Sequence, residues 1–168
     1  MNEDIEIYLA ASDDIPRIWC LAEEYFASVA TFAGEMSPPS KSSFVEYWSE
    51  EPSRYVIVAR AESASLGFCL LQEIDGSAYD LERCLELGAI FVRKQFRGRG
   101  GSKKLWREAV RIAKRDNLSI TSEVSVDNTL SRQIIGKLLA DASDDKLSRR
   151  LRPKPRAPNR LQAILHQG

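Results

Sequence analysis

Three glycines and four basic residues lie together in residues 97–104, shortly after the apolar run of residues 84–92. The glycines are Gly98, Gly100 and Gly101, and the basic residues are Arg97, Arg99, Lys103 and Lys104. Glycine lets a ligand approach the main chain without a Cβ in the way. The first N–H groups of a helix that begins here have no helical partner and carry the positive end of its dipole. The stretch therefore predicts a phosphate site, with the four basic side chains as mobile positive charge around it.

The spacing of the glycines excludes two common nucleotide sites. The P-loop pattern G-x-x-x-x-G-K-[ST] is absent from the chain. Three glycines within four residues also do not give the G-x-G-x-x-G fingerprint of dinucleotide-binding domains. The predicted anion site is therefore of a different type.

Hydrophobic periodicity predicts the elements that position this stretch. A period of two marks strands, and three- and four-residue steps mark helices. The predicted strands cover residues 5–9, 54–60, 66–74, 84–92 and 118–126, with 159–166 as an edge strand. The predicted helices cover residues 15–29, 44–48, 105–113 and 129–139. This order indicates an α/β fold of the mixed α+β kind, with a central mixed sheet flanked by helices on both faces.

Length and composition indicate a single domain. A chain of 168 residues that is 43% hydrophobic has the size of one domain with one core, so we expect residues 1–168 to form that domain. The three cysteines are odd in number and lack C-x-x-C spacing, so we expect neither a disulfide framework nor a metal site. No apolar run approaches the roughly 18 residues of a membrane span. The expected location is the cytoplasm.

The glycine stretch also resembles a family signature. Gln95-Phe96-Arg97-Gly98-Arg99-Gly100 is similar to the Q/R-x-x-G-x-G/A motif of GCN5-related N-acetyltransferases (GNAT). As in that family, a strand ending in Val92 precedes the motif and a helix follows it. The motif also comes after the third of three consecutive strands, and two helices follow the first strand. The resemblance implies an N-acetyltransferase that uses acetyl-CoA as co-substrate.

A coenzyme A site built from three segments is implied by this resemblance. Its members are Ile90 and Val92, then Arg97, Gly98, Arg99, Gly100, Gly101, Ser102 and Lys103, and finally Asn128 and Ser131. The family implies that N–H groups of the loop hold the pyrophosphate and that the strand pairs with the pantetheine arm. It also implies that Asn128 binds the arm and that Ser131 lies near the phosphates. The alternatives are a plain basic helix N-terminus for the loop and a helix cap for Asn128.

Glu86 is the predicted general base. Some members of the family place a glutamate at this position. Glu86 lies six residues before Val92, so in a regular strand it shares a face with Gly88, Ile90 and Val92. A carboxylate there can accept the proton of an amine directly or through water. The alternative is an exposed carboxylate at the strand end, paired with Arg83 or Arg93.

No residue stands out as the general acid. The family usually has a tyrosine seven residues after the position of Asn128, where this chain has Ile135. Ser131, Tyr79 or Tyr25 could take its place, water could protonate the leaving thiolate, or the protein could bind acyl-CoA without turnover. If Ile135 faces the thioester, Ile135→Tyr should raise turnover. If it lies in the core, the same change should destabilise the fold.

The acceptor is expected to be cationic. Residues 1–95 contain 7 Lys and Arg against 17 Asp and Glu, and residues 96–168 contain the reverse. Within residues 23–51 one lysine opposes six glutamates, Glu23, Glu24, Glu35, Glu46, Glu50 and Glu51. This excess suits a primary amine of a small molecule or a protein lysine, and a solvated acidic helix face is the alternative.

The segment Arg149 to Arg160 has six basic residues, three prolines and no acidic residue. It is expected to be extended and exposed, as a contact for nucleic acid or an acidic protein or as an ordinary solvated loop. Three functions remain open. The first is transfer of acetyl from acetyl-CoA to a primary amine by direct attack. The others are a catalytically silent acyl-CoA-binding module that acts through this segment, and an acyltransferase with a charged tRNA as acceptor.

Overall fold

The computed structural model describes residues 4–33, 37–77, 82–125, 128–141 and 151–154. These residues form a six-stranded sheet in the order β1-β2-β3-β4-β5-β6. The first four strands run antiparallel to their neighbours, and β4, β5 and β6 are parallel. The strands are β1 (Glu6–Leu9), β2 (Arg54–Ala61), β3 (Ala64–Asp75), β4 (Arg83–Val92), β5 (Ser119–Ser125) and β6 (Leu151–Lys154).

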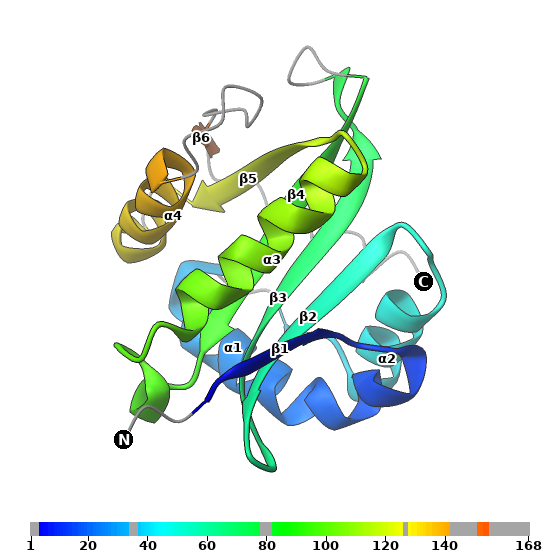
Figure 1. Ribbon diagram of the computed structural model, residues 1–168, viewed down its shortest axis with the longest axis vertical. Helices are drawn as coiled ribbons and strands as arrows, with labels where there is room; N and C mark the ends of the chain where they lie inside the picture. The colour runs from blue at the N-terminus through cyan, green and yellow to red at the C-terminus, as the bar shows by residue number, and fades with distance from the viewer. Residues whose placement is uncertain (1–3, 34–36, 78–81, 126–127, 142–150, 155–168) are drawn as a thin grey trace.

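Helices cover both faces of this sheet, as predicted (Figure 1). They are α1 (Ile15–Ala33), α2 (Lys41–Ser49), α3 (Gly101–Arg115) and α4 (Thr129–Asp141), and short 3₁₀ turns lie at Ser12–Asp14 and Lys94–Phe96. The helix α3 buries Leu105, Ala109 and Ile112 against one face. On the other face, α1 and α2 bury residues such as Ile18 and Phe44. The predicted order of strands and helices is confirmed from the first strand to α4.

A β-bulge in β4 reverses the direction of its side chains. Leu70 of β3 pairs with Ala89 but Leu71 pairs with Leu87, so Gly88 is the extra residue. Before the bulge, Leu87 faces the α3 side; after it, Val92 faces the α3 side. Glu86 therefore lies on the face toward α1 and α2. The prediction that Glu86 shares a face with Ile90 and Val92 is wrong, because the strand is not regular between them.

The strands β4 and β5 separate along their length. Their pairing covers Cys84 to Glu86 on β4 and Ser119 to Thr121 on β5, and Figure 1 shows the two strands diverging from that end. The hydroxyl of Ser122 donates to the Leu87 carbonyl at 3.1 Å, where the pairing ends. Among the described residues, no strand pairs with the rest of β4 on the side of β5.

Ile90 and Val92 direct their main-chain groups toward this side of β4. The N–H of Arg93 donates to the Leu66 carbonyl at 2.9 Å, which makes this pair a hydrogen-bonded one. Such pairs alternate in an antiparallel ladder. Ile90 and Val92 are thus the residues whose N–H and C=O groups point away from β3.

Part of the basic segment is described. Leu151–Lys154 is an extended edge strand, parallel to β5, and its Pro153 lies opposite Val124. The predicted edge strand at residues 159–166 lies outside the described residues. None of the helices described is both long and apolar enough to cross a lipid bilayer.

Candidate active site

The glycine loop joins β4 to α3 in a conformation that favours glycine. Gly98 has a φ of 80° and Gly100, the N-cap residue of α3, has a φ of 83°. Both are exposed, and a Cβ at either position would meet no atom within 4 Å. No side chain caps the N-terminus of α3. The first N–H groups of this helix therefore have room for an anionic ligand on their open side.

The basic side chains around the loop are not all mobile, in contrast to the prediction. The Nε of Arg97 donates to the Val92 carbonyl at 3.0 Å. The Nζ of Lys104 donates to the Ile5 carbonyl at 2.9 Å. The guanidinium of Arg99 lies over the Phe96 ring, 5.4 Å from its centroid. Lys103 is exposed at the start of α3. Arg97 and Lys104 thus also hold the loop in place.

Asn128 caps the last helix. Its side-chain oxygen accepts the N–H of Ser131 at 3.0 Å, which confirms the capping interpretation. Both side chains are half-buried. Because β4 and β5 are parallel, their carboxyl ends lie at the same end of the sheet. The start of α3 and the start of α4 therefore face the same opening between these strands.

Glu86 lies in a polar row that crosses four strands. Arg54 of β2 is opposite Gln72 of β3, Gln72 is opposite Glu86, and Glu86 is opposite Thr121 of β5. Glu86 is 5% exposed. The Oγ of Thr121 lies 3.6 Å from the sulfur of Cys84. The row places the carboxylate of Glu86 among polar neighbours, on the face of the sheet that α1 and α2 cover.

Tyr47 of α2 covers this row. Its hydroxyl donates to Gln72 Oε1 at 2.6 Å, and the Arg54 guanidinium lies 3.5 Å from the centroid of its ring. Burial above all raises the pKa of Tyr47; Arg54 opposes the shift, and the charge of Glu86 adds to it. Sequence reasoning missed Tyr47 and Gln72. A glutamine within the apolar run of β3 was the available signal.

The exposed-carboxylate alternative for Glu86 is wrong. Glu86 is buried, and the two arginines proposed as its partners bind other residues. Arg83 forms an ion pair with Glu73, and Arg93 forms one with Glu24. The described residues contain no group of three or more His, Cys, Asp or Glu side chains placed to hold a metal ion.

A family model identifies the family to which this chain belongs. The model of the acetyltransferase (GNAT) family matches residues 16–139. This range contains the glycine loop, Glu86 and nearly all of α1 and α4. The chain belongs to the GNAT family.

Solved GNAT structures have the same fold at low identity. An aminoglycoside acetyltransferase from an uncultured soil metagenomic sample, in complex with trehalose, is 16% identical with a TM-score of 0.64, over 89% of this chain and 97% of that chain. Aminoglycoside N-acetyltransferase AAC(6')-Iy in complex with CoA is 18% identical with a TM-score of 0.66, over 91% and 95%. A ribosomal-protein-alanine N-acetyltransferase from Brucella melitensis biovar Abortus 2308 is 17% identical with a TM-score of 0.63, over 88% and 98%. A comparison with curated protein sequences finds no match.

This GNAT chain differs from the family pattern at the position of the acid. Ile135 is 7% exposed and packs in the core on the α3 side of the sheet. Of the other hydroxyls, burial raises the pKa of Tyr25 to about 12, which makes it a weak donor to a thiolate. Ser131 is half-buried at the start of α4, and Tyr79 lies outside the described residues.

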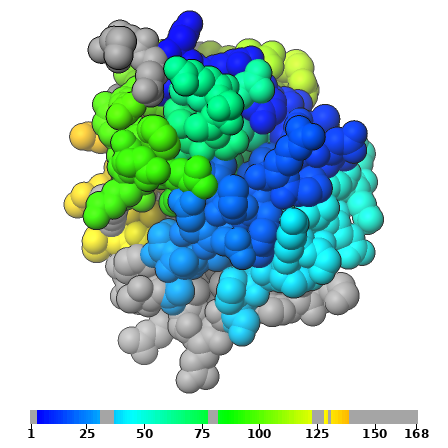
Figure 2. Space-filling model, turned by 90° about the horizontal axis from the view of Figure 1, so that it is seen from below, coloured from blue at the N-terminus to red at the C-terminus, as the bar shows by residue number. Residues whose placement is uncertain are grey.

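The glutamates expected to attract the acceptor of this GNAT domain lie on α1, on α2 and directly after α2. Five of the six predicted glutamates lie on described residues, and all five are exposed: Glu23, Glu24, Glu46, Glu50 and Glu51. Glu24 is bound by Arg93. Glu35 lies outside the described residues. Figure 2 shows the face on which α1 and α2, in blue to cyan, lie beside the green segment that follows β4.

Proposed function

We propose that the chain is an N-acetyltransferase that moves the acetyl group of acetyl-CoA to a primary amine of a small molecule or a protein lysine by direct attack. The whole chain, residues 1–168, is proposed as one acyltransferase domain. Acetyl-CoA is the co-substrate of the GNAT family. The observation that carries the proposal is the glycine loop, since it leaves the first N–H groups of α3 uncapped by side chains.

The residues present fit a bound coenzyme A. Gly98, Gly100 and Gly101 with the main chain of Arg97 to Ser102 are proposed to hold the pyrophosphate, and Arg99 and Lys103 to add charge. The proposed partners of the pantetheine arm are the main-chain groups of Ile90 and Val92. In support, these groups point away from β3 where the pairing with β5 has ended. Asn128 and Ser131 are proposed to border the arm and the phosphates.

Glu86 is the proposed general base. Its carboxylate accepts a proton from the acceptor amine, directly or through water, and so frees the nitrogen lone pair. Bound acetyl-CoA supplies the acetyl group as a thioester: the new N–C bond forms, the C–S bond breaks, and its electron pair leaves on sulfur. Water is the proposed proton source for the thiolate, because a thiol pKa of about 8.5 does not demand a dedicated acid.

The acceptor is proposed to be cationic. The exposed glutamates of α1, of α2 and of the two residues after α2 are proposed to attract amines in their protonated form. Glu86 faces the same side of the sheet. Aminoglycoside and ribosomal-protein-alanine acetyltransferases are among the structures with this fold. Their names suggest polycationic small molecules and protein amines as the first acceptors to test.

Thiol release from acetyl-CoA tests this proposal. The panel consists of an aminoglycoside, a polyamine, a lysine peptide and a peptide with N-terminal alanine, each with Glu86→Gln as the matched variant. We expect at least one amine to release CoA thiol faster than buffer, and the variant to be slower with that amine. Absence of release with every amine, together with tight CoA binding, would overturn the enzyme in favour of a silent acyl-CoA-binding module.

The silent module is the second candidate, and the burial of Ile135 in the core favours it. Such a module acts on nucleic acid or an acidic protein through residues 149–160. An acyltransferase for charged tRNA would contact its RNA through the same segment. RNA binding that weakens steeply with salt would support an RNA contact. Binding that does not change with salt would exclude it.

A further inference from the structure

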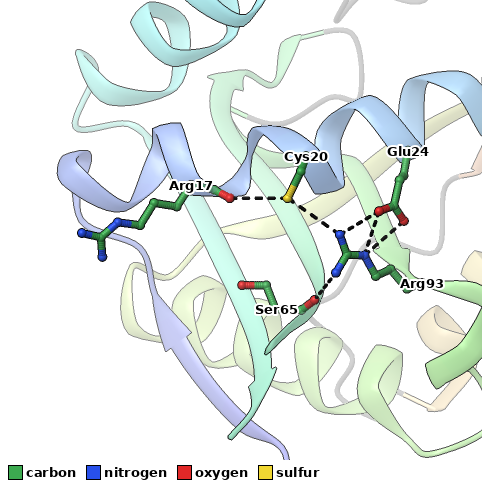
Figure 3. A network of polar contacts seen from close by, with 5 residues as sticks. All are labelled: Arg17, Cys20, Glu24, Ser65 and Arg93. Atoms are coloured by element: carbon green, nitrogen blue, oxygen red, sulfur yellow. Dashed lines mark hydrogen bonds and ion pairs between the residues drawn. The ribbon is translucent and has the colours of Figure 1, made fainter. Parts of the chain in front are cut away.

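Arg93 is the first residue after β4, and each nitrogen of its guanidinium has a partner (Figure 3). The Nε donates to the two carboxylate oxygens of Glu24 at 2.9 and 3.1 Å. One terminal nitrogen lies 2.7 Å from Glu24 Oε1 and 3.7 Å from the sulfur of Cys20. The other donates to the Ser65 carbonyl at 3.2 Å. All three nitrogens of this side chain therefore have partners on the body of the domain.

These contacts tie three segments to one side chain. Glu24 and Cys20 belong to α1, and Ser65 lies next to the turn between β2 and β3. In Figure 2, α1, the turn between β2 and β3, and the green segment after β4 lie next to one another on one face. The main chain of Arg93 takes part as well, since its N–H donates to the Leu66 carbonyl and its own carbonyl accepts the Phe96 N–H, both at 2.9 Å. Arg93 thus fixes the point at which the glycine loop begins.

Within the loop, Arg97 donates to the Val92 carbonyl, but the two glycines with positive φ have no packing contacts. A Cβ at Gly98 or Gly100 would meet nothing within 4 Å, so these residues are not packed against the domain. Beyond them, Lys104 is anchored to the Ile5 carbonyl. The loop is therefore held by three side chains, Arg93 before it, Arg97 within it and Lys104 after it. Glycine-rich main chain is otherwise free to adopt many conformations, and ordering it on ligand binding opposes affinity.

The ion pair between Arg93 and Glu24 is expected to contribute little to the free energy of folding. The side chains of Arg93 and Glu24 are 21% and 46% exposed, and exposed pairs contribute little to folding. The hydrogen bond with Glu24 raises the pKa of Arg93, so Arg93 stays charged. What is unusual is the geometry, because a planar guanidinium that binds a carboxylate and a carbonyl at once has a fixed orientation.

We propose that Arg93 is a positioning residue for coenzyme A, which holds the start of the glycine loop against α1 and the β2–β3 turn so that its N–H groups are already arranged for the pyrophosphate. This inference rests on the proposed function. Its three nitrogens contact Glu24, Cys20 and Ser65, so no direct contact of Arg93 with the phosphates is proposed. Its effect is on the affinity for coenzyme A through the order of the loop.

Calorimetric titration with coenzyme A, together with thermal melting of the ligand-free protein, tests this role in the full chain. The variants are Arg93→Met, Arg93→Lys, Glu24→Gln and the double variant Arg93→Met/Glu24→Gln. The matched control is Arg83→Met, which removes the ion pair with Glu73 at the opposite end of the same strand. We expect Arg93→Met to weaken the affinity for coenzyme A about tenfold while the melting temperature changes by less than about 3 °C.

The other variants separate geometry from charge. Arg93→Lys should bind as weakly as Arg93→Met, since an ammonium cannot bind Glu24 and Ser65 in the same planar arrangement. Glu24→Gln should lose less affinity for coenzyme A than Arg93→Met does. The double variant should bind coenzyme A no more weakly than Arg93→Met alone. Arg83→Met should bind as the wild type does.

Several results would overturn the role of Arg93. They are wild-type affinity in Arg93→Met, full rescue by Arg93→Lys, or additive losses in the double variant. A loss of affinity matched by an equal loss in Arg83→Met would do so too. If the wild type itself does not bind coenzyme A, it is the proposed function that fails, so the two failures can be told apart.

Discussion

Gly98 and Gly100 are needed for their conformation and not for the space around them. Both have a positive φ, and a Cβ would meet nothing within 4 Å. Gly101 differs, because it has helical geometry and a Cβ there would lie 3.7 Å from Val92 Cγ2, an ordinary contact. The sequence shows three similar glycines, and only the structure separates their roles.

This difference predicts opposite outcomes for two neighbouring substitutions. Gly100→Ala should cost about 1–2 kcal/mol, because a left-handed conformation strains a residue with a Cβ, and it should weaken coenzyme A binding by distorting the loop. Gly101→Ala should change the free energy of unfolding by less than about 0.5 kcal/mol. Urea unfolding and calorimetry measure both quantities. Equal losses in the two variants would contradict the assignment of conformational strain to Gly100.

Glu86 has the second residue-level prediction. Glu86→Gln keeps the size of a buried side chain and removes its basicity, so turnover should fall about a hundredfold while the affinity for coenzyme A is unchanged. The loss should shrink at high pH, where the amine is already neutral. Glu73→Gln, in the neighbouring strand, is the control. An unchanged rate for Glu86→Gln at neutral pH would leave Glu86 with a structural role in the polar row.

Tyr25 predicts a pH dependence of stability. Burial raises the pKa of its phenol from 10.0 to about 12. The unfolded chain loses this proton from about pH 10, whereas the folded protein keeps it, so this contribution is complete below pH 10 and is lost as the pH rises toward 12. The expected slope is about 1.4 kcal/mol per pH unit. Urea unfolding of the wild type and Tyr25→Phe between pH 9 and 12 should show a smaller alkaline loss in the variant. Parallel curves would mean that Tyr25 titrates normally.

At the scale of elements, β4 explains what the sequence could predict and what it could not. Its apolar run gave the strand and its place before the glycine loop. The period-two pattern placed Glu86 on the wrong face, because the bulge at Gly88 adds one residue and moves every later side chain to the other face. A glycine in the middle of a strand was the only local signal of that bulge. The engagement of Arg93 depends on contacts with Glu24 and Ser65, distant in sequence, so no local pattern indicated it.

The helix α4 presents Ile135 to the core and Ile134 to solvent. Ile135 is 7% exposed and Ile134 is 40% exposed. Ile135→Tyr should therefore destabilise the protein by about 1–3 kcal/mol, because a larger side chain overpacks the core. Ile134→Tyr, on the same helix, should cost less than about 0.5 kcal/mol. Thermal melting of both variants tests this. A stable Ile135→Tyr variant with faster thiol release would show instead that the position faces the thioester.

At the scale of the whole molecule, the charge imbalance of the chain becomes a difference between the two sides of the sheet. The helices α1 and α2, with three glutamates against one arginine and one lysine, cover one side, and α3, with six basic residues against one glutamate, covers the other. The predicted halves of the sequence thus correspond to a side that suits a cationic acceptor and a helix start that suits a phosphate. The two sides meet along β4, which carries Glu86 toward α1 and α2 and continues into the glycine loop.

Binding of acetyl-CoA tests the central claim most directly, because every proposed role of the loop, the β4 edge and Asn128 depends on it. A saturating titration should give a calorimetric signal with one site per chain. At about a hundred times its dissociation constant, the ligand should stabilise the native state by about 2.7 kcal/mol, seen as a higher melting temperature. Replacement of Gly98 or Gly100 by a bulky residue should abolish that rise. No heat of binding and no change in melting temperature with the wild-type protein would contradict the assignment of this loop to coenzyme A.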